Sequence, residues 1–93
     1  MRLILLTLDL YLPQSHSLKD KRRVIKGLKD KLRARFNVSV AETDYQDAWQ
    51  RSLIAIALIA LDNSGADRTI SLIRQLVDEL FDVQVVNIER TEY

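Results

Sequence analysis

The chain contains no cysteine among its 93 residues, which excludes disulfides, thiolate metal sites and thiol nucleophiles. It also lacks an apolar run of membrane-spanning length, because the longest, residues 53–61, is about half of what a bilayer requires. Histidine occurs once, as His16, without a second metal-ligating side chain at a useful spacing. We therefore expect a cytoplasmic protein with no metal, no cofactor and no contact with a membrane.

Positive charge is distributed unevenly along the chain. Residues 17–36 hold nine of the 14 lysines and arginines and two of the 13 acids, which gives this segment a net charge of +7. The rest of the chain carries −6, so the total of +1 hides a strong asymmetry. A concentrated basic segment is typical of proteins that bind a polyanion.

The apolar periodicity predicts four strands and two helices. The first strand occupies residues 1–13, and its core face consists of Ile4, Leu6, Leu8, Leu10 and Leu12. Further strands are expected at residues 38–42, 51–61 and 82–90.

Two amphipathic helices are expected, over residues 17–36 and from residue 64 onward. Ser17 with Asp20 matches the capping box that begins a helix. Ser64 with Asp67 repeats the pattern at the second helix. The residues expected on the core faces of the helices are Leu18, Val24, Ile25, Leu28, Leu32 and Phe36, and then Ile70, Ile73, Leu76, Val77, Leu80 and Phe81.

The order of these elements predicts an α+β fold of the ferredoxin-like type, βαββαβ. Two helices would cover one face of a four-stranded antiparallel sheet with the strand order 4-1-3-2, and we expect residues 1–93 to form this single domain. The loops at residues 13–17 and 43–50 would then meet at one end of the sheet. Residues 13–17 lack the glycine and the arginine with which the acylphosphatases of this fold hold phosphate, so we expect no enzymatic activity.

A stripe of basic side chains is expected along the first helix, beside its core face: Lys19, Arg22, Arg23, Lys26, Lys29 and Arg33. Such a stripe is suited to neutralising successive phosphates, and we predict that it binds nucleic acid. Two other interpretations stay open. The bases either pair with acids of the hairpin and the second helix, or form an ordinary solvated surface. The acids available for such pairing are Asp44, Asp47, Asp67, Asp78 and Glu79.

The first two turns of this helix carry bases where the helix dipole already presents partial positive charge. A helix N-terminus with free amides and nearby bases binds anions. We therefore predict a phosphate or sulfate site at Ser15, His16, Ser17 and Lys19. Asp47 could orient His16 as a general base, but we favour hydrogen bonding of His16 within its loop.

Lys21 lies inside the apolar arc of the first helix. Its stem either extends past the edge of the sheet, or its ammonium group meets Asp44 or Asp47, and we favour a structural role. A polar hairpin surface is expected beside it, formed by Tyr45, Asp47, Trp49 and Arg51. The two aromatic side chains either stack on nucleic-acid bases or fold onto the end of the sheet.

The sheet face that points away from the helices is expected to carry Leu3, Leu5 and one apolar side of the third strand. Exposed apolar surface of this size marks an interaction site. We therefore expect a second copy of the chain, or a partner protein, to cover this face.

Four segments of the chain, HSLKDKR at residues 16–22, FNVSVAE at 36–42, DYQDAWQR at 44–51 and RTEY at 90–93, together resemble the bacterial YlxP-like family, a domain of unknown function. The resemblance covers essentially the whole chain. It implies a ferredoxin-like fold and an association with ribosome assembly or translation. The motif residues that it implies are His16, Ser17, Lys19, Lys21, Arg22, Asp44, Gln46, Asp47, Trp49, Gln50 and Arg51.

The leading hypothesis from the sequence is a non-enzymatic module that contacts RNA or a ribosomal particle through the basic helix and the hairpin end. The alternative is a homodimeric protein-interaction domain whose charges only keep it in solution.

Overall fold

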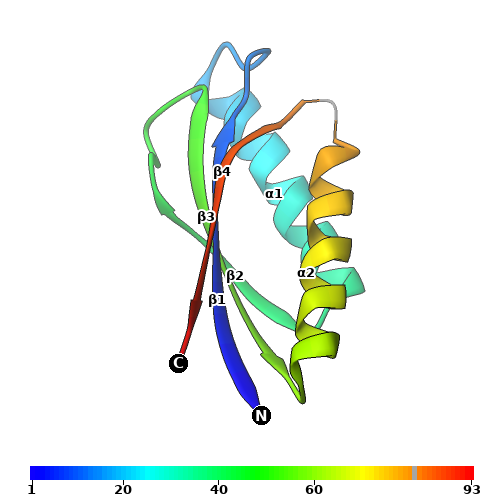
Figure 1. Cartoon of the computed structure of the whole chain (residues 1–93). Helices are drawn as coiled ribbons and strands as arrows, with labels where there is room; N and C mark the ends of the chain where they lie inside the picture. The colour runs from blue at the N-terminus through cyan, green and yellow to red at the C-terminus, as the bar shows by residue number, and fades with distance from the viewer. Residues whose placement is uncertain (81) are drawn as a thin grey trace.

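The computed structural model describes residues 1–80 and 82–93. Its elements are β1 (Arg2–Tyr11), α1 (Leu18–Arg35), β2 (Val38–Asp44), β3 (Arg51–Ala60), α2 (Asn63–Asp78) and β4 (Gln84–Glu92). The strands form one antiparallel sheet in the order β2-β3-β1-β4, and both helices cover the same face (Figure 1). This is the ferredoxin-like arrangement predicted, with the strand order 4-1-3-2 read from the other edge.

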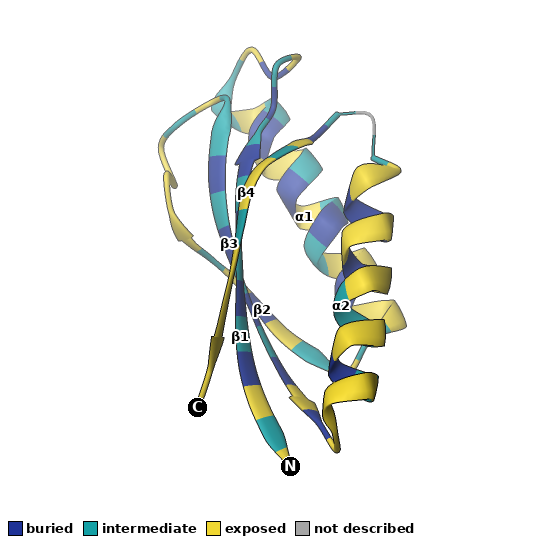
Figure 2. Ribbon diagram, in the orientation of Figure 1, coloured by how far each residue is buried: buried dark blue, intermediate teal, exposed yellow. Residues whose placement is uncertain are grey.

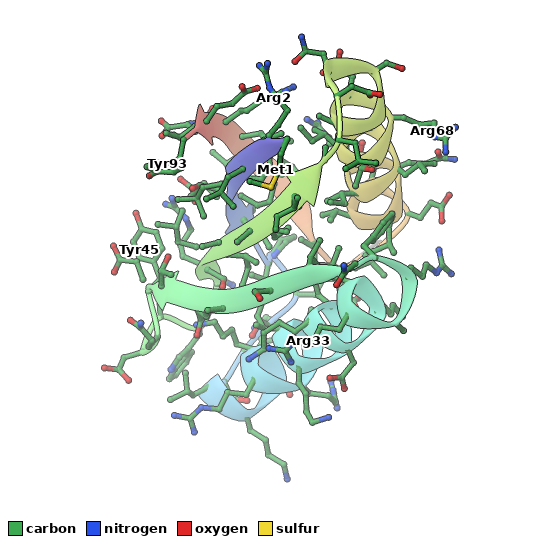
Figure 3. All side chains as sticks on the ribbon, turned by 90° about the horizontal axis from the view of Figure 1, so that it is seen from below. Met1, Arg2, Arg33, Tyr45, Arg68 and Tyr93 are labelled. Carbon is green, nitrogen blue, oxygen red and sulfur yellow. The ribbon has the colours of Figure 1, made fainter. Side chains whose placement is uncertain are left out.

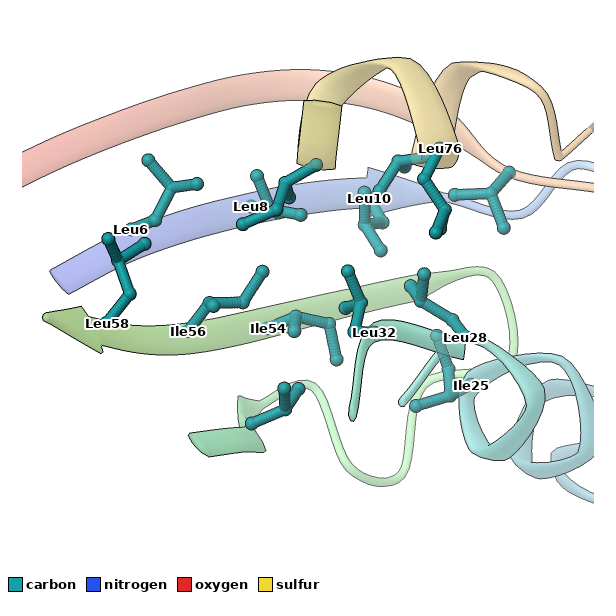
Figure 4. Close-up of a cluster of buried hydrophobic side chains, with 14 of the residues drawn as sticks. Leu6, Leu8, Leu10, Ile25, Leu28, Leu32, Ile54, Ile56, Leu58 and Leu76 are labelled. Atoms are coloured by element: carbon teal, nitrogen blue, oxygen red, sulfur yellow. The ribbon is translucent and has the colours of Figure 1, made fainter. Parts of the chain in front are cut away.

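The core lies between the sheet and the two helices, as the burial colours of Figure 2 show. All five even-numbered apolar residues expected on the core face of β1 are buried there. Ile54, Ile56 and Leu58 of β3 extend the same face, and Leu28 and Leu32 of α1 pack onto it (Figure 4). Of the residues expected on the core faces of the helices, six are buried, while Val24, Phe36, Ile70 and Leu80 are partly buried and pack against the core. Leu18 is half-buried, and Phe81 lies outside the described residues.

The two helices begin in different ways. Ser17 caps α1 as predicted, because its hydroxyl accepts a hydrogen bond from the Asp20 amide at 3.0 Å. The box expected at Ser64 is wrong: Asp62 caps α2 by accepting from the Gly65 amide at 2.7 Å, and Asp67 lies beyond the first turn. Neither helix, in the part of the chain that the structure describes, is long and apolar enough to cross a bilayer.

All four strands differ from the prediction by one or two residues at their ends. β2 continues to Asp44, past an irregularity in its pairing with β3 that shifts the register between Glu42 and Asp44. β4 begins at Gln84 and not at residue 82, because the Val83 amide donates to the Leu80 carbonyl in a turn. It ends at Glu92, two residues later than expected.

Arg90 links β4 to its neighbours at the end of the sheet where both chain termini lie. Its guanidinium binds Asp67 of α2 at 2.8 Å and Glu92 at 2.7 Å, and Arg2 of β1 also pairs with Glu92. The hydrogen bonds from Arg90 and Arg2 lower the pKa of Glu92 below its ordinary value, while those to Asp67 and Glu92 raise the pKa of Arg90. Both shifts in pKa favour the charged forms of Arg90 and Glu92.

Candidate nucleic-acid interface

The β1–α1 loop (residues 12–17) and the β2–β3 hairpin (residues 45–50) meet at the upper end of the sheet in Figure 1, as the topology predicted. The Leu12 amide donates to the Gln50 carbonyl at 2.9 Å. The Gln50 side-chain amide donates to the carbonyls of Pro13 and Ser15, each at 3.2 Å. These three hydrogen bonds hold the two loops together.

Lys21 joins α1 to the hairpin from inside the protein. Its side chain has 0% exposure, and Nζ donates to the carbonyls of Tyr45 at 2.6 Å and Gln46 at 3.3 Å. Its ion-pair partner is Glu42, at 2.9 Å, and not Asp44 or Asp47 as expected. The hydroxyl of buried Ser52 donates to the same carboxylate. Glu42 pairs with Lys21, and the hairpin acids do not, because Glu42 lies on the helix side of β2, opposite Ile54 of the core face.

The open face of the sheet carries an ordered cluster where it reaches the hairpin. The Arg51 guanidinium binds both carboxylate oxygens of Asp9, at 2.8 and 3.0 Å, and lies 4.8 Å from the centroid of the Tyr45 ring. The hydrogen bonds that Arg51 donates to Asp9 raise the pKa of Arg51 above its ordinary value. A cation held in this way braces the aromatic ring next to it.

Both aromatic residues of the predicted hairpin surface are exposed. Trp49 is 56% exposed and Tyr45 is 36% exposed, so neither is folded away under the end of the sheet. Tyr11, the last residue of β1, lies opposite Arg51 in the register of β1 and β3 and adds a third aromatic side chain to this region. Neither Tyr11 nor Asp9 was among the predicted site residues, although their odd positions in β1 place both on the open face.

A groove runs along α1 beside the edge strand β2. It encloses about 380 Å³ and is lined by Arg22, Ile25, Lys26, Lys29, Asp30, Arg33 and Glu42. We call it the α1–β2 groove. Its four bases are spaced by four, three and four residues and therefore follow one side of the helix over about 16 Å. Four of the six residues predicted to bind nucleic acid are thus brought together.

Two of these four bases have partners within the protein. Lys26 binds Asp30 at 2.7 Å, a contact that lowers the pKa of Asp30. Arg33 lies between α1 and β2, where it donates to the Val40 carbonyl at 2.8 Å (Figure 3). In the described part of the chain, Arg22 and Lys29 make no ion pair or side-chain hydrogen bond. Among the residues that the structure describes, no groove base forms an ion pair with the hairpin or with α2, which was the alternative raised from the sequence.

The other two predicted bases lie outside the groove. Lys19 is exposed, and Arg23 lies 3.8 Å from Asp20. Arg23 also lines a smaller pocket of about 120 Å³, together with the carboxylates of Asp20 and Asp82. The groove therefore contains part of the predicted stripe, and nucleic-acid binding by Lys19 and Arg23 stays a prediction.

The residues predicted to bind an anion lie together, but most of their polar groups have partners. The Ser15 hydroxyl donates to the Ser17 carbonyl at 3.2 Å, and Ser17 Oγ accepts from the Asp20 amide. The His16 backbone amide donates to the Asp20 carboxylate at 3.2 Å. Because Asp20 brings negative charge to this helix end, it opposes an anion there. The anion site stays a prediction.

The open face becomes apolar toward the chain termini. Leu3 is 42% exposed and its partner in β3, Ile59, is 63% exposed. Leu5 and Ala57 form the next pair along the same two strands and are half-buried. In the part of the chain that the structure describes, this apolar pair of strands is not covered by another element.

Comparison with known proteins confirms the family that the sequence resembles. Residues 3–90 match the family model described as "Protein of unknown function (DUF503)". The chain belongs to the DUF503 family. A curated relative, "Uncharacterized protein YlxP" of Bacillus subtilis (strain 168), is 32% identical over 77 residues, which cover 83% of each chain. The DUF503 match covers the residues of the α1–β2 groove, the hairpin and the Asp9–Arg51 pair.

Proposed function

We propose that this DUF503 protein is a non-enzymatic cytoplasmic module that contacts RNA through the α1–β2 groove. The observation that carries the proposal is the groove itself, where Arg22 and Lys29 present unpaired charge along a rigid helix. Lys26 and Arg33 lie on the same side and have further N–H groups to donate. The ribosomal particle implied by the family resemblance is the RNA source that we propose to test first.

Electrostatics supports a polyanion over a single anion in this groove. Its bases are distributed over about 16 Å and do not converge on one point. A phosphate chain meets such a row one charge at a time and releases a counterion at each contact. Asp30 and Glu42 reduce the local charge, but each is already paired with a lysine, Lys26 and Lys21 respectively.

Salt dependence tests this proposal. We expect the logarithm of the RNA association constant to fall linearly with the logarithm of salt concentration, with a slope of roughly −1.4 to −2.8 for two to four phosphates. Fluorescence anisotropy of a labelled RNA measures the slope, and co-sedimentation with ribosomal subunits at the same salt concentrations identifies the particle. Absence of RNA binding at about 50 mM salt would refute the proposal, since electrostatic contacts are strongest there.

A second candidate function rests on a different observation, the uncovered pair Leu3 and Ile59 on the open face. We propose that a second copy of the chain covers this face, which would make the protein a homodimeric interaction domain. Light scattering at high concentration is expected to give twice the mass of the 10.8 kDa chain. Ile59→Asp should return the mass to that of a monomer without loss of helix content. A monomeric wild-type protein would exclude this candidate.

A further inference from the structure

Trp49 is an exposed aromatic residue on a hairpin that the rest of the protein holds rigid. From its surroundings we infer that the hairpin is a base-stacking site and that the ligand of the α1–β2 groove is single-stranded RNA. This inference rests on the proposed function and specifies the class of RNA. Aromatic side chains beside a basic groove are the usual means by which single strands are held without sequence preference.

The hairpin is fixed on both sides of Trp49. Before it, the Tyr45 carbonyl accepts hydrogen bonds from Lys21 Nζ at 2.6 Å and from the Ala48 amide at 3.0 Å. After it, Gln50 is bound to the β1–α1 loop through its side chain and its carbonyl. A stacking surface held in this way loses little conformational entropy when a ligand binds.

The hairpin also contains two features that cost stability. Tyr45 has a φ of 61°, in the left-handed region that side chains with a Cβ rarely adopt. Arg51 Nε is buried without a hydrogen-bond partner in the described structure. Strain and unsatisfied groups of this kind concentrate at functional sites, and here both lie at the Tyr45–Arg51 contact, 4.8 Å from guanidinium to ring.

The groove and the hairpin are connected through α1. The uppermost base of the groove, Arg22, follows Lys21, whose ammonium group contacts the hairpin backbone. A single strand with its phosphates along α1 would therefore bring its next bases toward the hairpin, where Trp49 is the more exposed aromatic residue. A duplex of the same length keeps its bases paired inside and presents none to the hairpin.

The acids of the hairpin favour bases over phosphates as its ligands. Asp44 and Asp47 are exposed and form no ion pair in the residues that the structure covers. Carboxylates repel phosphates but accept hydrogen bonds from the amino groups of bases, as Asp and Glu do from cytosine. Phosphate binding by the groove and base binding by the hairpin therefore occupy separate surfaces.

The single tryptophan of the chain makes the inference directly measurable, because Trp49 fluorescence reports stacking at this residue alone. We expect a short single-stranded RNA of mixed sequence to quench this fluorescence. The same RNA annealed to its complement and inorganic polyphosphate should both bind without quenching. Trp49→Ala should weaken single-strand binding roughly 5- to 150-fold and leave polyphosphate binding unchanged. Trp49→Phe, which keeps an aromatic face, should retain most of the affinity.

Three results would overturn the inference. Trp49→Ala could bind the single strand as wild type does, the duplex could bind as tightly as the single strand, or polylysine could quench Trp49 where RNA does not. The last result would identify the hairpin as a contact for a basic protein. In each case, polyphosphate binding that still depends on salt would leave the groove proposal intact. A wild-type protein that binds neither polyphosphate nor RNA would refute both the stacking inference and the groove proposal.

Discussion

Lys21→Met is expected to lower the free energy of unfolding by roughly 3–5 kcal/mol, because breaking a buried ion pair leaves an uncompensated charge inside the protein. Methionine fits the space of the lysine stem but provides no donor for Glu42 or for the carbonyls of Tyr45 and Gln46. The hairpin would also lose its tie to α1. Urea denaturation followed by circular dichroism measures the change.

The matched control for this substitution is Lys19→Met, on the same helix two residues earlier, where the side chain is exposed. It should change stability by less than about 0.5 kcal/mol. The double variant Lys21→Met with Glu42→Leu should recover part of the loss, since it removes both charges. If Lys21→Met and Lys19→Met have the same stability, Lys21 does not hold the hairpin in the way described here.

Reversing the charge of the two unpaired groove bases, Arg22→Glu with Lys29→Glu, is expected to weaken RNA binding roughly 50- to 100-fold at about 50 mM salt. The slope against salt should become less negative by about 1.4, the value for two phosphate contacts. Lys26 and Arg33 are left in place because their contacts with Asp30 and Val40 contribute to the fold. Anisotropy of the labelled RNA provides both quantities.

The control variant has the same change in net charge on the other flank of the same helix. Lys31 and Arg35 are exposed and do not line the α1–β2 groove. Lys31→Glu with Arg35→Glu should therefore reduce affinity only through long-range electrostatics, several-fold less than the groove variant. Equal losses in the two variants would mean that overall charge, and not the groove, attracts the RNA.

The fold follows from patterns that are local in the sequence. Alternation in residues 1–13 and the apolar arc of α1 determine which faces are buried, and the order of elements then leaves few topologies. Strand ends were less predictable, because the extent of β2 depends on its irregular pairing with β3 at Glu42 and Asp44. The predicted start of α2 was wrong because Ser64 and Asp62 both have side chains that can cap a helix, and the sequence does not show which of them does so.

The location of the site was predictable from the sequence, but the partners of its charged side chains were not. Charge and topology brought α1 and the hairpin together, yet the partner of Lys21 depends on which side of β2 each acid faces, and that requires the register. Which of the basic residues line the groove is also a tertiary effect, since it depends on where α1 packs against β2. The hydrogen bond from Arg33 to Val40 has no signal in the sequence, because its acceptor is a backbone carbonyl.

The contact of Arg33 with the Val40 carbonyl has a consequence for the edge of the sheet. β2 is an edge strand, and exposed backbone groups on such a strand invite pairing with strands of other molecules. The guanidinium blocks one of these groups with a side chain from the same chain. A phosphate that draws Arg33 away would uncover the strand, so occupation of the groove and the tendency of β2 to join a foreign sheet are thermodynamically linked.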